Sequence, residues 1–172
     1  NNITNLVKIG AVHLEPIGVY SAKYKSLSEV QDGDEVIIPN DATNGGRALL
    51  LLEKEGLIKL DDNTNLAATE ANIVENNKNL KFTAMEAASI PSTYQEAGLA
   101  VINSNYALGV NLNPLNDSLA IEATDSPYAN IVVARTEDAD KPEIKKVMEA
   151  LNSEKVKKYI EDTYKGAILP VF

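Results

Sequence analysis

The segment EVIIPNDATNGGRALLLLEKEGL, residues 35–57, decides the fold. Its run VII is apolar and β-branched, which predicts a buried strand. Asp41 or Thr43 can cap the helix that follows, and Gly56 is typical of a helix end. The helix has a broad apolar face made of Ala48, Leu49, Leu51 and Leu52. The segment therefore predicts a βα unit with a polar turn at the carboxyl end of its strand.

Strand and helix patterns alternate along the rest of the chain. Pro16 and Gly18 predict a turn, and residues 80–98 predict a short strand and a helix interrupted near Pro91. Further strands are expected at 6–14, 99–103, 118–123 and 129–135. Further helices are expected at 26–30, at 104–109 and, as an amphipathic pair with Ser153 capping the second, at 140–166. This alternation predicts an α/β fold.

The composition restricts the possible functions. The chain has 172 residues with 44% hydrophobic and 24% charged side chains, which is typical of a soluble domain. A net charge of −9 opposes binding to nucleic acid, whose phosphates need a basic surface, whereas a small polar or zwitterionic ligand is compatible with it. With no cysteine and one histidine, no cofactor and no metal site is expected.

Arg47 follows two glycines at the start of the predicted helix. A positive charge is unfavourable at this end of a helix dipole, so another interaction is needed to hold the guanidinium. The first backbone N–H groups of a helix attract anions, Gly45 and Gly46 would let an anion approach, and Arg47 would bind it bidentately. An intramolecular salt bridge to an acidic side chain explains the residue equally well. The segment TNGGRA lacks the lysine and the spacing of a phosphate-binding loop.

Polar residues follow the predicted strands. Asn103 ends a buried strand, and ligands of open α/β sheets bind at the carboxyl ends of strands. Asn40, Asn44 and Asn103 could reach one crevice and bind an ammonium and a carboxylate, although asparagine is also common in turns. His13 shares a strand face with Glu15, which is weak evidence for acid–base chemistry. Tyr20 could line an apolar pocket or complete a core.

Five segments resemble one known family. They are VHLEPIGVYS at 12–21, IPNDATNGGRALLLLEKEGLIKL at 38–60, LAVINSNYALGVNLNP at 99–114, DSPYANIVVAR at 125–135 and YKGAILPVF at 164–172. Together they resemble the methionine-binding lipoproteins of the MetQ/NlpA group, which deliver methionine to an ABC importer. The resemblance implies a two-lobed periplasmic-binding-protein fold of type II that closes on an amino acid.

The resemblance implies roles for five residues. Arg47 is expected to hold the ligand carboxylate with Asn44 beside it, and Asn103 is expected to contact the amino-acid head group. His13 and Tyr20 match a family stretch near the cleft. Residues 1–24 and 125–172 are expected to form a partial first lobe, and 25–124 the second lobe. Family members begin with a lipidated cysteine and further first-lobe elements, which we expect to precede this sequence in the full-length protein.

The favoured hypothesis is therefore a non-catalytic methionine-binding protein. Its expected partners are methionine and a membrane permease and ATPase complex, with an extracytoplasmic location and a lipid anchor that this chain lacks. The alternatives are the same scaffold binding another amino acid or a dipeptide, and an enzyme that uses the α/β crevice. The enzyme is the weakest alternative because the sequence offers no convincing nucleophile, metal cluster or phosphate loop.

Overall fold

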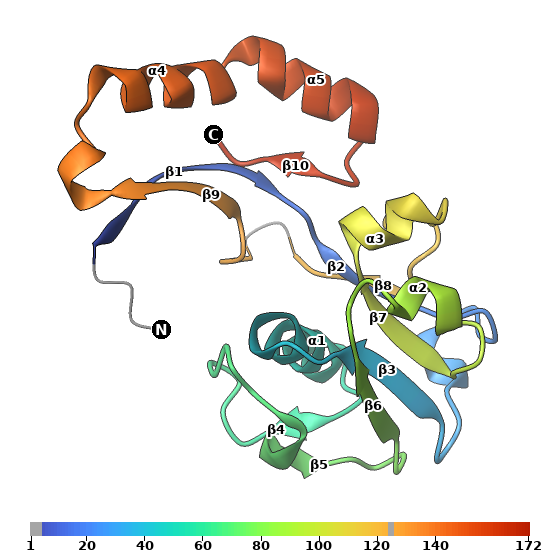
Figure 1. Ribbon diagram of the computed structural model, residues 1–172. Helices are drawn as coiled ribbons and strands as arrows, with labels where there is room; N and C mark the ends of the chain where they lie inside the picture. The colour runs from blue at the N-terminus through green and yellow to red at the C-terminus, as the bar shows by residue number, and fades with distance from the viewer. Residues whose placement is uncertain (1–4, 124–125) are drawn as a thin grey trace. The chain divides into compact units, whose positions relative to one another are not determined.

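The computed structural model describes residues 5–123 and 126–172. The chain forms two compact units (Figure 1). One consists of Asn1–Glu15 with Ala123–Phe172, and the other is the continuous segment Pro16–Glu122. The α/β class predicted from the sequence is confirmed in both units, since each combines an open sheet with helices.

The continuous unit is built on a five-stranded sheet with the order β6-β3-β7-β2-β8. Its strands are β2 (Ile17–Tyr20), β3 (Glu35–Pro39), β6 (Lys81–Met85), β7 (Leu99–Asn103) and β8 (Ala120–Ile121). β3 runs parallel to both β6 and β7, whereas β2 is antiparallel to β7 and β8. The carboxyl ends of β3 and β7 therefore lie at the same edge of the sheet.

Alternating side chains of this sheet form two apolar cores. On one face Ile17, Val36 and Val101 pack with the apolar face of α1 (Ala42–Lys54). On the other face Ile37 and Ile102 pack with α2 (Ile90–Thr93) and α3 (Ser104–Gly109). The alternation follows from the two-residue period of a strand. The shorter elements of the unit are η1 (Leu27–Glu29), η2 (Glu70–Asn72), β4 (Lys59–Leu60) and β5 (Ile73–Glu75).

The discontinuous unit has a three-stranded antiparallel sheet with the order β10-β1-β9. Its strands are β1 (Leu6–Leu14), β9 (Asn130–Arg135) and β10 (Leu169–Pro170), and η3 (Thr136–Asp138) follows β9. The two amphipathic helices are α4 (Pro142–Leu151) and α5 (Glu154–Tyr164), and Ser153 caps the second as predicted. Met148 of α4 lies against Gly10 of β1, and Ile160 is the buried residue of α5.

Two predictions about the N-terminal third differ from the structure. Residues Ile17–Tyr20 form the buried strand β2 rather than the turn suggested by Pro16 and Gly18. Their pairing with β7 and β8 outweighs the local turn signal. For the same reason the chain enters the continuous unit at Pro16, not at the expected boundary between 24 and 25. The other expected boundary, at 124 and 125, lies outside the described residues.

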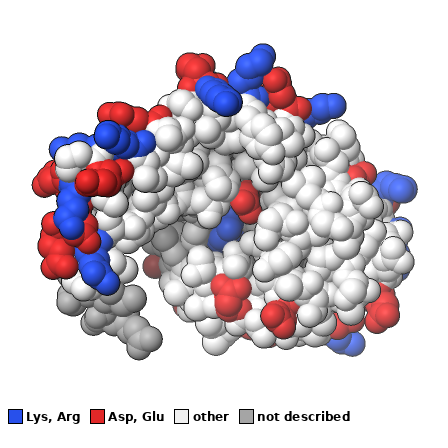
Figure 2. Space-filling model, turned by 45° about the horizontal axis from the view of Figure 1, so that its top comes forward, with Lys and Arg blue, Asp and Glu red and all other residues white. Residues whose placement is uncertain are grey.

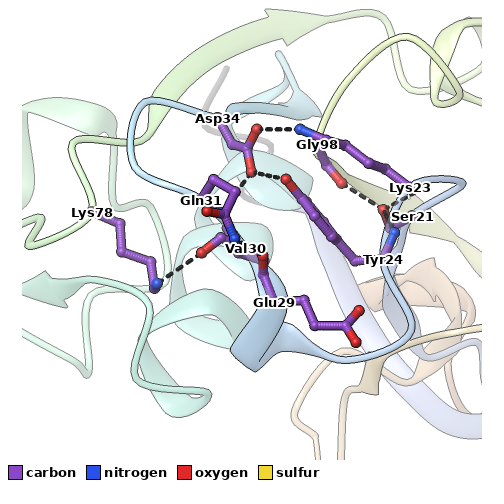
Figure 3. Close-up of polar contacts among 9 residues, drawn as sticks. All are labelled: Ser21, Lys23, Tyr24, Glu29, Val30, Gln31, Asp34, Lys78 and Gly98. Atoms are coloured by element: carbon purple, nitrogen blue, oxygen red, sulfur yellow. Dashed lines mark hydrogen bonds and ion pairs between the residues drawn. The ribbon is translucent and has the colours of Figure 1, made fainter.

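A polar cluster fixes the amino ends of β3 and β7 (Figure 3). The Asp34 carboxylate, 11% exposed, accepts hydrogen bonds from Tyr24 Oη at 2.6 Å, Lys23 Nζ at 2.8 Å and the Gln31 backbone N–H at 2.8 Å. Burial acts to raise the pKa of Asp34, but these three donors outweigh it, so the pKa lies below its ordinary value. Ser21 Oγ donates to the Gly98 carbonyl at 2.6 Å, which links the same loop to the start of β7.

The surface carries charges of both signs. On the face drawn in Figure 2, positive and negative side chains of the described residues are interspersed rather than segregated. Ion pairs between exposed side chains include Lys59–Glu75 and Lys158–Asp162. No helix within residues 5–123 and 126–172 is long and apolar enough to cross a membrane.

Candidate functional site

Four polar side chains meet at the carboxyl edge of the parallel strands in the continuous unit. Asn103 is the last residue of β7, and the alternation 99, 101, 103 directs its side chain to the face covered by α1. Asn44 and Arg47 lie three residues apart in the first turns of α1, so they share one side of that helix. Glu122 directly follows β8.

Arg47 forms a side-on ion pair with Glu122. Its Nε donates to Glu122 Oε1 at 3.1 Å, and its Nη2 donates to Glu122 Oε2. The two side chains are only 8% and 13% exposed, so the pair is largely removed from water. Glu122 is itself fixed, because its Oε2 accepts the Ile17 backbone N–H at 3.2 Å and its own N–H donates to the Ile17 carbonyl at 2.9 Å.

Asn44 links the other members of the cluster. Its Oδ1 accepts from Arg47 Nη1 at 3.3 Å and from Asn103 Nδ2 at 2.8 Å. Its Nδ2 donates to the Asp41 carboxylate at 3.0 and 3.2 Å. Asn103 is buried, and its Oδ1 has no hydrogen-bond partner among the described residues. A buried carbonyl of this kind needs a donor, which a ligand ammonium can supply.

The start of α1 is occupied by the protein's own atoms. Asp41 caps the helix by accepting the Asn44 N–H at 2.9 Å, so an internal carboxylate already occupies the helix end proposed for a ligand anion. A Cβ on Gly45 would lie 2.9 Å from the Pro39 carbonyl oxygen, and one on Gly46 would overlap the Leu66 carbonyl. The expectation that the glycines admit an anion is therefore wrong: they admit neighbouring backbone.

The structure brings together three of the five predicted site residues: Asn44, Arg47 and Asn103. Tyr20 packs in the core on the α2 and α3 face, where burial, with a further contribution from Asp117, raises the pKa of its hydroxyl. His13 belongs to the other unit. Its Nε2 lies 2.9 Å from Glu15 Oε1, in agreement with the expectation that the two side chains share a face. Asn40 is exposed at the end of β3.

Sequence reasoning missed Glu122. The predicted salt bridge of Arg47 to an acidic side chain is confirmed. The sequence contains 25 acidic residues, and its pattern does not show which of them is the partner. One usable signal was present, because Glu122 lies near the end of the strand predicted at 118–123, as Asn103 lies at the end of the strand predicted at 99–103. Residues 5–123 and 126–172 contain no group of three or more His, Asp or Glu side chains placed to bind a metal.

The chain belongs to the NlpA lipoprotein family, whose match extends over residues 1–172. It is 44% identical over 163 residues to the D-methionine-binding lipoprotein MetQ of Salmonella typhi, covering 94% of this chain and 60% of that protein. It is 43% identical over 175 residues to the methionine-binding lipoprotein MetQ of Bacillus subtilis (strain 168), covering 99% of this chain and 64% of that protein. The chain thus spans less than two thirds of the length of both relatives.

Solved structures agree with this membership. A nutrient binding protein from Burkholderia cenocepacia bound to methionine superposes with a TM-score of 0.93 at 42% identity, covering 98% of this chain and 71% of that one. A lipoprotein structure from Bacillus subtilis subsp. subtilis str. 168 superposes with a TM-score of 0.91 at 43% identity, covering 97% of this chain and 69% of that one. The predicted family and its substrate-binding-protein fold are therefore confirmed.

Proposed function

We propose that the full-length protein binds methionine and delivers it to an ABC importer. The observation that carries the proposal is the cluster of Arg47, Asn44 and Asn103 at the carboxyl edge of the sheet. Support comes from the relatives named as methionine-binding lipoproteins and from the similar structure that contains methionine.

The cluster suits an α-amino carboxylate. Arg47 offers guanidinium N–H groups to the ligand carboxylate, which favours a charge-assisted hydrogen bond. Asn103 Oδ1 is the buried acceptor for the ammonium group. Asn44 positions both side chains, since its Oδ1 accepts a hydrogen bond from each. We do not assign Tyr20 a ligand contact, because it packs on the opposite face, and the role of His13 stays a prediction.

Another amino acid or a dipeptide is the second candidate. The observation that favours it is that every proposed contact involves the head group, which all α-amino acids share. Under either candidate the protein is a binding protein and not an enzyme, as its relatives are named for binding. The proposed location is extracytoplasmic with a lipid anchor, and the proposed partner is the membrane permease and ATPase complex. The two compact units would belong to the two lobes.

Calorimetry on the full-length protein with a panel of free amino acids, both methionine enantiomers and methionine dipeptides tests the proposal. Methionine should bind at least about tenfold tighter than leucine, since its thioether side chain is the remaining source of discrimination. Tighter binding of another amino acid would support the second candidate. No binding to any α-amino acid would contradict both.

A further inference from the structure

We propose that Glu122 positions Arg47 and makes the site selective for a zwitterion over a simple carboxylate. The inference rests on the proposed function and extends it to a residue outside the head-group contacts. It begins from the ion pair that Glu122 forms with Arg47, whose two side chains are 8% and 13% exposed.

Geometry supports the positioning role. Glu122 occupies the Nε–Nη2 edge of the guanidinium, and Asn44 Oδ1 accepts from Nη1. Because a guanidinium is planar and rigid, contacts from two sides fix both its position and its plane. The Glu122 carboxylate is in turn held to Ile17, the first residue of β2, because its Oε2 accepts the Ile17 backbone N–H and the Glu122 N–H donates to the Ile17 carbonyl. The orientation of Arg47 is thus set from two sides, by Glu122, which is anchored to β2, and by Asn44 of the helix that carries Arg47.

Charge balance supports the selectivity. Arg47 and Glu122 together carry no net charge, and both are largely removed from water. A ligand with only a carboxylate would add one negative charge to this buried and neutral ion pair, which is costly in a medium of low polarity. A zwitterion adds no net charge, and its ammonium can donate to Asn103 Oδ1. Glu122 therefore penalises ligands that lack the amino group.

The test compares L-methionine with 4-(methylthio)butanoate, its analogue without the amino group, by calorimetry on the full-length protein. Glu122→Gln removes the charge and nearly preserves the shape. We expect methionine to bind at least about tenfold more weakly to this variant, and the preference for methionine over the analogue to fall at least about tenfold. Glu75→Gln is the matched control, because Glu75 pairs with Lys59 on the surface, and it should change neither quantity.

Glu122→Asp provides a second variant that keeps the charge. Its shorter side chain should weaken methionine binding about tenfold while leaving the preference for methionine close to that of the parent. If Glu122→Gln fails to fold, Glu122→Asp still tests the positioning role, because an unchanged affinity of Glu122→Asp for methionine would overturn that role. An unchanged preference in a folded Glu122→Gln variant would overturn the selectivity. A parent that binds no amino acid would instead refute the proposed function itself.

Discussion

At the scale of single residues, the cluster at the carboxyl edge is a chain of mutually oriented polar groups. Asp41 holds Asn44, Asn44 holds Arg47 and Asn103, and Glu122 holds Arg47 from the other side. Such networks stabilise a structure more than isolated contacts do, because each hydrogen bond fixes the partner of the next. Removing one member should therefore affect both folding and binding, and the two effects have to be separated.

Arg47→Ala should lower the free energy of unfolding by about 3 kcal/mol, because it leaves the Glu122 carboxylate buried without its cation. It should also abolish methionine binding. The double variant Arg47→Met/Glu122→Leu replaces the pair by apolar side chains of similar size and should recover the stability within about 1 kcal/mol, but not the binding. Urea denaturation and calorimetry measure the two effects. Tight methionine binding by the double variant would show that Arg47 does not hold the ligand carboxylate.

Asn103→Ala should weaken the binding of all amino acids by a similar factor. It removes the proposed acceptor of the ammonium group and the hydrogen bond to Asn44, which together are worth about 1–3 kcal/mol. The measurement is calorimetry with methionine and the next-best ligands of the panel. A variant that changes its order of preference would place Asn103 beside the ligand side chain instead.

At the scale of elements, the sequence predicts where α1 begins and ends, but it does not explain the glycines near the start of this helix. Its cap at Asp41, its apolar face and its end near Gly56 follow local rules and could be predicted. The need for a glycine at position 46 could not be predicted, because it depends on the Leu66 backbone, 20 residues further along the chain. The fold of residues 64–68 brings the Leu66 carbonyl onto Gly46, and no local pattern encodes that contact.

Gly46→Ala should destabilise the protein by about 1–3 kcal/mol, since the new Cβ would overlap the Leu66 backbone, which cannot move as a side chain can. Gly109→Ala is the control. It also lies in a helix, but its Cβ would meet nothing within 4 Å, so helix propensity should make it neutral or stabilising by up to about 1 kcal/mol. Thermal unfolding distinguishes the two. Equal effects would mean that the Leu66 segment is free to move away.

The Asp34 cluster predicts a dependence of stability on pH. The pKa of Asp34 is lower in the folded protein than the ordinary value of about 3.9, so its contribution is complete above about pH 4 and is lost as pH falls through the folded value. Asp34→Asn should therefore cost about 1–3 kcal/mol at pH 7 and progressively less below pH 4. Asp32→Asn, exposed in the same turn, is the control. A cost that does not change with pH would contradict an ionic role for Asp34.

At the scale of the whole molecule, the chain passes twice between units, after Glu15 and after Glu122. The sequence predicts most strands and helices because their periodicity is local. It does not predict that β2 is inserted between β7 and β8, or that Glu122 reaches Arg47 across 75 positions. Both depend on strand pairing between distant segments, which is set by the packing of the finished sheet. The grouping of Asn44, Arg47 and Asn103, the residues we propose for the site, could be predicted because each lies at a strand end or near a helix start.

The two units bury apolar surface to different extents. In the continuous unit every residue of β7 is buried between two cores, and β7 is hydrogen-bonded to a strand on either side. In the other unit, β1 and β9 keep apolar side chains partly exposed: Leu6, Val7, Ile131 and Val133. Since burial of apolar surface is the main source of stability, the discontinuous unit has less to oppose its opening.

Hydrogen exchange of the 172-residue chain at pH 7 should therefore be slower in the continuous unit than in the discontinuous unit. Amides of β7 should exchange only on global unfolding, and those that pair β1 with β9 should exchange at least about tenfold faster through opening of their own unit. Mild denaturant should leave the β1 and β9 rates nearly unchanged while accelerating β7 steeply, because global unfolding exposes more surface than opening one unit. The amides of α1 serve as an internal reference, since they belong to the unit of β7. Equal protection and equal denaturant dependence in β1 and β7 would show that the two units open together as one cooperative structure.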